Sequence, residues 1–270
     1  MSSAPKGEPF VAFDHVVKAF GPKKIYDDLT LTVQKGETLT LLGGSGTGKS
    51  VLLRLLIGLL KPDAGTVTVA GEDITNFTEE QLLPIRKRIS MLFQGGALFD
   101  SISVGDNIAY PLREHFQFSE AEIRDRVAEK LELVGLPGIE AQKPASLSGG
   151  MRKRVALARA LAGDPEMVLY DEPTTGLDPV NTRRISELIV SVNEKLKVTQ
   201  LVVTHDMPSA FMVSNRMAML HERQIIAVLS REEFRDSKIK AIREFVDAMS
   251  ENERPESAPE KQSNKKEQSS

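Results

Sequence analysis

The octapeptide GGSGTGKS, from Gly43 to Ser50, constrains the fold of this chain more than any other stretch. It fits the phosphate-binding pattern GxxxxGK[ST] at every fixed position, with a strand candidate before it (37–42) and an apolar helix candidate after it (51–60). In this context the glycines let successive backbone N–H groups surround an anion at a helix N-terminus. Lys49 supplies charge for the terminal phosphates, and the Ser50 hydroxyl is placed to ligate Mg²⁺. The stretch predicts a nucleoside triphosphate site rather than a flexible glycine turn.

Composition limits the possible partners. The 270 residues are 40% hydrophobic and 27% charged, as expected of a soluble globular protein with one large domain or two lobes. With no cysteine, neither disulfides nor thiolate metal sites can form. The net charge of −3 gives no general attraction to nucleic acid. No apolar run approaches the roughly 18 to 20 residues of a membrane span, and no signal-peptide pattern opens the chain.

The first part of the chain is predicted to be rich in strands. Short strand candidates lie at 10–13, 29–33, 38–42 and 66–69, with glycine and proline turns between them. Within this lobe Phe20 could stack on a nucleobase, and Tyr26 is the rival for that role. A plain core position is the alternative for an aromatic residue.

The middle of the chain is predicted to be helical. After a strand candidate at 89–93 and Gln94, the pair Ser119 and Glu122 forms a capping box for a helix with one buried face. A second helix is expected to begin at Ser148, in LSGGM, and to end at Gly163. Its hydroxyl and two glycine N–H groups make a second anion site, about 100 residues from the first.

Polar residues then follow two apolar strand candidates directly. Asp171 and Glu172 end the strand candidate at 167–170, and His205 ends the one at 200–204. Carboxyl ends of parallel strands are where α/β proteins place reacting groups, so metal and proton chemistry are expected there. Between them Asp178 caps a helix whose first residue is Pro179.

The C-terminal part is predicted to hold two more strands and one last helix, over about 231–249, capped by Ser230 with Glu233. The apolar face of this helix could pack on the core or serve a neighbouring subunit. Residues 1–9 are an N-terminal extension. Residues 250–270 contain one aliphatic residue, Ala258, and are predicted to form a disordered tail.

These motifs, in this order and spacing, resemble those of ATP-binding cassette (ABC) ATPases. The resemblance covers roughly residues 10 to 230 and rests on GGSGTGKS, Gln94, LSGGM, MVLYDEP, Gly176-Leu177-Asp178 and His205. It implies an α/β fold of the P-loop NTPase type, with a RecA-like core, an antiparallel β subdomain and an inserted helical subdomain at about 95–163. The ABC domain would then span 10–249.

The resemblance also implies the site residues of an enzyme that hydrolyses ATP with Mg²⁺. Glu172 would polarise the attacking water, His205 would contact the γ-phosphate, and Gln94 would sense metal and phosphate. The metal ligands would be Ser50, Gln94 and Asp171. ATP would be bound by Phe20, Gly43, Gly44, Ser45, Gly46, Thr47, Gly48, Lys49 and Ser50, and, from a second copy of the chain, by Ser148, Gly149, Gly150 and Asp178. Met151 departs from the family pattern, which more often has glutamine there.

The stretch from Arg86 to His115 looks like the Mla and Mce-associated branch, which serves phospholipid movement between membranes. This branch implies a peripheral subunit on the cytoplasmic face of the inner membrane, with a separate membrane permease and with Mce-domain and STAS-domain proteins as further expected partners. The stretch 95–110 would receive the permease. The alternatives are a polar-substrate importer or a lipoprotein-releasing ATPase, and a regulatory module that binds ATP without hydrolysing it. The last would require Glu172 or His205 to be missing.

Overall fold

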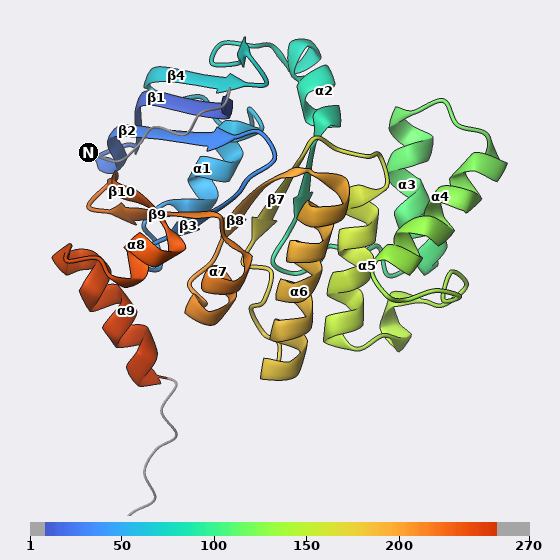
Figure 1. Ribbon diagram of the computed structural model, residues 1–270. Helices are drawn as coiled ribbons and strands as arrows, with labels where there is room; N and C mark the ends of the chain where they lie inside the picture. The colour runs from blue at the N-terminus through green and yellow to red at the C-terminus, as the bar shows by residue number, and fades with distance from the viewer. Residues whose placement is uncertain (1–8, 253–270) are drawn as a thin grey trace, which may run out of the picture.

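The computed structural model describes residues 9–252, with two sheets and helices on both faces of the larger one (Figure 1). The predicted extension 1–9 and the predicted tail 250–270 lie mostly outside the described residues. Among residues 9–252 the longest helices are too short or too polar to cross a bilayer. The architecture therefore matches the expected α/β class, with an antiparallel and a largely parallel sheet.

The smaller sheet is antiparallel, with the strand order β2-β1-β4-β5. Its strands are β1 (Pro9–Phe20), β2 (Lys23–Gln34), β4 (Ala64–Val69) and β5 (Glu72–Asp73). β1 and β2 each run for 12 residues, longer than predicted, because register shifts along their pairing let the strands continue through polar positions. The left-handed backbone of His15, with φ of 49°, lies within one of these shifts.

The larger sheet has the order β10-β9-β3-β8-β7-β6. From β9 to β6 all neighbouring strands are parallel, and β10 pairs antiparallel with β9. Its strands are β3 (Thr38–Leu42), β6 (Ile89–Leu92), β7 (Met167–Asp171), β8 (Thr199–Val203), β9 (Arg216–His221) and β10 (Gln224–Ser230). Parallel pairing brings the carboxyl ends of β3, β8, β7 and β6 to one edge, which positions the site.

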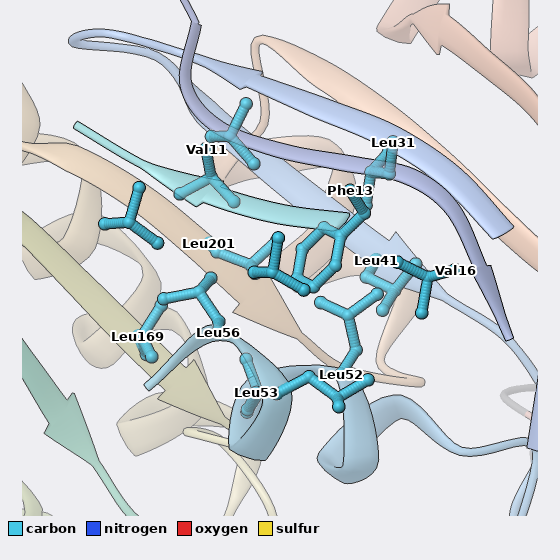
Figure 2. Close-up of a cluster of buried hydrophobic side chains, with 14 of the residues drawn as sticks. Val11, Phe13, Val16, Leu31, Leu41, Leu52, Leu53, Leu56, Leu169 and Leu201 are labelled. Carbon is cyan, nitrogen blue, oxygen red and sulfur yellow. The ribbon is translucent and has the colours of Figure 1, made fainter. Parts of the chain in front are cut away.

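One hydrophobic core joins the two sheets through α1 (Lys49–Leu56), the helix that follows the glycine loop. Figure 2 shows Phe13 of β1 above Leu52 and Leu53 of α1, with Leu41 and Leu201 of the larger sheet beside them. All five side chains are almost fully buried. This packing fixes the start of α1 against the sheet edge. α2 (Glu79–Arg88) covers the end of the same core, and its N-terminus carries a capping box.

A second core lies on the opposite face of the larger sheet. Alternation along the strands divides the two cores, because Leu169 and Leu201 belong to the first whereas Val168 and Val202 belong to the second. The helices that pack on this second core are α3 (Val104–His115), α4 (Glu120–Leu133), α5 (Gly149–Leu161) and α6 (Pro179–Leu196). A 3₁₀ turn, Pro144–Ser146, precedes α5. α3 and α4 lie at the end of the molecule away from the antiparallel sheet (Figure 1).

A third cluster holds the C-terminal segment and α7 (Met207–Val213). One last helix was predicted here, but the chain forms two, α8 (Arg231–Arg235) and α9 (Lys240–Asn252). The predicted capping box of Ser230 and Glu233 begins α8, which ends at Asp236 after little more than one turn. The break lets Phe234 and Ile242, from different helices, both reach full burial in this cluster. Most of the apolar face therefore packs on the chain's own core.

Candidate active site

The glycine loop leads from β3 into α1 at the carboxyl edge of the larger sheet. Gly48 has a φ of 112°, and a Cβ there would lie 2.6 Å from Cγ2 of Ile25. A Cβ on Gly43 would lie 2.7 Å from the carbonyl oxygen of Leu220. Both positions therefore require glycine, for the backbone angle at Gly48 and for space at each. Thr47 supports the loop by donating its hydroxyl to the Gly44 carbonyl at 2.9 Å.

Lys49 lies across this loop with only 8% of its surface exposed. Its Nζ donates to the carbonyls of Gly43, at 2.8 Å, and Gly44, at 3.0 Å, and lies 4.0 Å from Oε1 of Glu172. Burial lowers the pKa of Lys49, and the charges of Glu172 and Asp171 oppose that shift. The ammonium group is therefore held in the cleft, ready to attract an anion.

A hydroxyl and a carboxylate meet next to the loop. Ser50 Oγ donates to Oδ1 of Asp171 at 3.3 Å, although the two residues are 121 positions apart. Burial raises the pKa of Asp171, and the nearby charge of Glu172 adds to that effect, while the Ser50 bond opposes it. A partly buried carboxylate beside a hydroxyl suits Mg²⁺, which takes one or two protein oxygens and completes its shell with phosphate and water. These residues fit the metal.

Glu172 follows β7 in a left-handed conformation, with φ of 50°. Its N–H donates to the Val203 carbonyl at 2.8 Å, which fixes the residue against β8. Its Oε2 lies 2.9 Å from Nδ1 of His205 and 3.4 Å from Oγ1 of Thr175, which donates to it. The carboxylate is 14% exposed and the imidazole 53% exposed. The arrangement holds a carboxylate oxygen in place beside the glycine loop.

A cleft of 620 Å³ brings most of the predicted residues together. Its lining includes the predicted residues Gly43, Gly44, Ser45, Gly46, Gly48, Lys49, Ser50, Gln94, Glu172 and His205. Lys23 and Ile25 also line it, and nothing in their local sequence indicated this. The strand ends were a sufficient signal for the other residues, because parallel strands deliver their carboxyl ends to one edge.

The two candidates for base stacking are now distinguished. Tyr26 is fully buried, and its hydroxyl donates to the Gly48 carbonyl at 2.6 Å, so it supports the loop from below and cannot offer a face to a base. Phe20 is 47% exposed at the end of β1, where Nζ of Lys18 lies 5.5 Å from its ring centroid. Phe20 does not line the cleft, so its contact with a base stays a prediction.

The second predicted anion site, at the LSGGM turn, lies apart from the cleft. Ser148 caps α5 by accepting from the Met151 N–H at 3.2 Å, as predicted. A Cβ on Gly150 would lie 2.7 Å from Oδ1 of Asn181, whose N–H donates to Asp178 at 3.0 Å. The LSGGM turn and the Asp178 cap are therefore in contact with each other. Neither lines the cleft, so the two predicted phosphate-binding sites lie apart on one chain.

Hydrogen bonds hold the segment after Gln94 in place beside two exposed aromatic rings. Asn107 is fully buried, accepts from the Phe99 N–H at 2.8 Å and donates to the Phe99 carbonyl at 3.0 Å. Arg159 donates to the carbonyls of Ala97, at 2.9 Å, and Gly96, at 3.0 Å. The ring centroids of Phe99 and Tyr110 lie 5.0 Å apart, and the two residues are 45% and 44% exposed.

Part of the predicted docking surface belongs to the core instead. Val104 and Ile108 are fully buried in the second hydrophobic core, and Leu98 packs against it. Helical spacing turns Val104 and Ile108 inward, whereas Phe99 lies on the loop before the helix. Among the apolar residues predicted to meet a partner, Phe99 is the most exposed.

The structure also reveals Lys153, which sequence reasoning missed. It lies on α5 with 7% exposure, and its Nζ donates to the carbonyls of Glu172, Pro173 and Thr175. The only signal in the sequence is a lysine in an apolar helix, which does not reveal its partners.

Comparisons with known proteins agree with this geometry. Residues 26–175 match the family model described as ABC transporter. The probable ribonucleotide transport ATP-binding protein mkl of Mycobacterium tuberculosis is 47% identical over 231 residues, which cover 86% of this chain and 64% of that protein. This chain therefore spans less than two thirds of the length of that mycobacterial relative.

Two further proteins match over nearly their full length. The intermembrane phospholipid transport system ATP-binding protein MlaF of Haemophilus influenzae is 42% identical over 226 residues, covering 84% of this chain and 86% of that one. A solved dimeric structure, the post-hydrolysis state of the ATP-binding cassette MJ0796 bound to ADP and Pi, superposes with a TM-score of 0.74. It is 30% identical, and the match covers 82% of this chain and 98% of that one.

Proposed function

This chain belongs to the ABC transporter family, and we propose that it is the ATP-hydrolysing subunit of a complex that moves phospholipid between membranes. The observation that carries the hydrolytic part is the convergence of Lys49, the Ser50–Asp171 pair and the Glu172–His205 pair on one cleft. The lipid substrate is inferred from the likeness to MlaF, which extends over 84% of this chain and 86% of that protein.

ATP would lie with its phosphates in the glycine loop. Lys49 and the loop N–H groups bind the terminal phosphates, since both a positive charge and helix N-terminal donors stabilise anions. Ser50, Asp171 and Gln94 would hold Mg²⁺, which supplies neutralisation of the phosphate charge when bound. Phe20 would stack on the base.

Glu172 would act on the attacking water. Its carboxylate accepts a proton from water as the oxygen attacks the γ-phosphate, the bond between the γ-phosphorus and the bridging oxygen breaks, and ADP and phosphate are released. His205 keeps Oε2 of that carboxylate in place through the 2.9 Å contact with its Nδ1. Most of the rate gain would come from orientation and from charge stabilisation in a closed site.

Closure of the site would require two copies. Ser148, Gly149, Gly150 and Asp178 do not line the cleft of their own chain, so they are free to meet the ATP bound by a second copy. The similar cassette MJ0796 is described as dimeric. In the proposed dimer, ATP joins the two copies, and hydrolysis lets them separate.

The permease would receive this motion through the surface of Phe99 and Tyr110. Its loop begins at Gln94, which lines the cleft, and is anchored by Asn107 and Arg159. Two exposed aromatic rings, Phe99 on the anchored loop and Tyr110 on α3, suit the end of a partner helix. The chain would then lie at the cytoplasmic face of the inner membrane, with Mce-domain and STAS-domain proteins as further partners.

The experiment isolates the complex and measures transport directly. A tagged chain would be purified with its membrane subunits, its bound lipids and proteins identified by mass spectrometry, and lipid transfer measured between proteoliposomes with ATP. Lys49→Ala is the matched negative control. Bound phospholipid and ATP-dependent transfer, both lost in the control, are expected. Transfer that is independent of ATP, or equal in Lys49→Ala, would contradict the proposal.

A ribonucleotide transporter is the second candidate, because the mycobacterial relative with 47% identity carries that name. It would be a polar-substrate importer. The same proteoliposomes, supplied with labelled ribonucleotide, separate the two: ATP-dependent ribonucleotide uptake without lipid transfer would favour this candidate.

A further inference from the structure

A buried ammonium group lies beneath the turn that carries Glu172. Nζ of Lys153 donates to the carbonyls of Pro173 at 2.8 Å, Thr175 at 3.0 Å and Glu172 at 3.4 Å. An ammonium group has three donors, so this one turn satisfies all of them. Among residues 9–252 no carboxylate forms an ion pair with Lys153, and burial lowers its pKa against the opposing charge of Glu172. A charge buried without a carboxylate partner is costly unless its hydrogen bonds are complete.

The turn needs such support because its first residue is strained. Glu172 adopts a left-handed φ of 50°, which a residue with a side chain keeps only when its surroundings impose it. On one side its N–H is bound to Val203 at 2.8 Å. On the other side its carbonyl, and those of Pro173 and Thr175, accept from Lys153. Lys153 therefore holds the carbonyl side of Glu172, whereas Val203 holds its N–H side.

The hydrogen bonds of Lys153 act on the Glu172 carboxylate through Glu172 itself and through Thr175. The Glu172 carboxylate is attached to the residue that Lys153 holds, and Thr175, whose hydroxyl donates to the same carboxylate at 3.4 Å, is held by the same ammonium group. Without the ammonium, the turn can relax toward the right-handed region and move the carboxylate. A misplacement of about 1 Å at a reacting group can cost about 100-fold in rate.

We propose that Lys153 is a positioning residue for ATP hydrolysis, whose ammonium group clamps the turn from Glu172 to Thr175 and thereby aims the Glu172 carboxylate. Lys153 does not line the cleft, so it does not contribute to nucleotide binding. The proposal rests on the proposed catalytic role of Glu172. It predicts a defect in turnover and not in affinity.

Two variants of nearly equal length test the clamp. Lys153→Met keeps the apolar stem and removes every donor, whereas Lys153→Gln has an amide with two donors for three carbonyls. In steady-state ATPase assays of the full chain, kcat is expected to fall by about 10- to 100-fold for Lys153→Met and about 3- to 10-fold for Lys153→Gln. KM for ATP stays within about twofold. A merely structural lysine would not produce this split or the order of the two variants.

Lys143→Met is the matched control, because Lys143 also donates to a backbone carbonyl, that of Ser101 at 2.8 Å, but on a different turn. Its kcat is expected to equal that of the unaltered chain. A kcat within twofold of the unaltered chain for folded Lys153→Met overturns the proposal. A loss of activity that comes from an increased KM for ATP, with kcat retained, overturns it as well. If Lys153→Met does not fold, Lys153→Gln decides, and full activity of that variant is the refuting result.

Glu172→Gln separates failure of this inference from failure of the proposed function. If Glu172→Gln retains turnover, the catalytic role of Glu172 is wrong, and with it the premise of the clamp. If Glu172→Gln loses turnover while Lys153→Met retains it, only the clamp is wrong. In the double variant, Lys153→Met is expected to add less than twofold to the loss, because the group that it positions is already inactive.

Discussion

Replacing Glu172 with glutamine keeps the size of the side chain and removes its charge and its basicity. The carboxamide has nearly the shape of the carboxylate, so the 2.9 Å contact with Nδ1 of His205 can persist and the fold should be unaffected. General-base catalysis contributes about 10²- to 10⁴-fold, so turnover is expected to fall by that factor, or by about 3 to 5.5 kcal/mol of transition-state stabilisation.

ATP binding should change in the opposite direction. Oε1 of Glu172 lies 4.0 Å from Nζ of Lys49, next to the site of the terminal phosphates. Removing this negative charge relieves repulsion of the phosphates and leaves Lys49 without a competing partner, so the affinity for ATP is expected to rise. With binding intact and hydrolysis lost, ATP should hold two copies together.

The assay combines steady-state ATPase activity in the assembled complex, nucleotide affinity by titration with a fluorescent ATP analogue, and self-association by light scattering with ATP. Lys49→Ala is the comparison, since it should lose affinity as well as turnover. Turnover above a tenth of the unaltered complex, or a loss of ATP affinity in Glu172→Gln, would refute the role assigned to this carboxylate.

Other outcomes follow from the same structure. Ser148→Arg is expected to leave ATP binding to a single chain unchanged and to block ATP-dependent association; mixed dimers with Lys49→Ala should retain one competent site, and a mixed dimer with none would disprove the shared site. Phe99→Ala removes a half-exposed ring and one aromatic contact of about 0.5–1.5 kcal/mol, so the melting temperature should fall by only a few degrees, while permease co-purification and lipid transfer drop; persistent transfer with the permease bound would place Phe99 outside the contact. Burial raises the pKa of Asp164, but hydrogen bonds from Lys130 and Arg126 outweigh this, so its folded-state pKa is lowered. The stability that it contributes is present above its unfolded-state pKa and is lost as pH falls through the folded-state value, and Asp164→Asn should remove this part of the acid dependence in melting curves; an unchanged acid dependence would contradict it.

Local patterns were enough to predict most of the element types. The capping boxes at Ser119 and Ser230 and the cap at Asp178 begin helices in the structure, because capping is a hydrogen-bond relation within four residues. The same locality explains the failure at the last helix. Apolar spacing indicated one continuous face, but the burial of Phe234 and Ile242 in one cluster required a break between them.

Local motifs were sufficient to identify the glycine loop, the strand-end carboxylates and His205 as site candidates, because each depends on a short pattern and on the rule that parallel strands end at one edge. Which of the two aromatic residues is exposed could not be read from local patterns, since the Tyr26 hydroxyl donates to the Gly48 carbonyl, 22 residues away, inside the folded chain. The same holds for Lys153, whose partners lie 19 to 22 residues along the chain. A buried lysine is stabilised only by the acceptors that the folded chain brings to it, and no local pattern records where those acceptors will be.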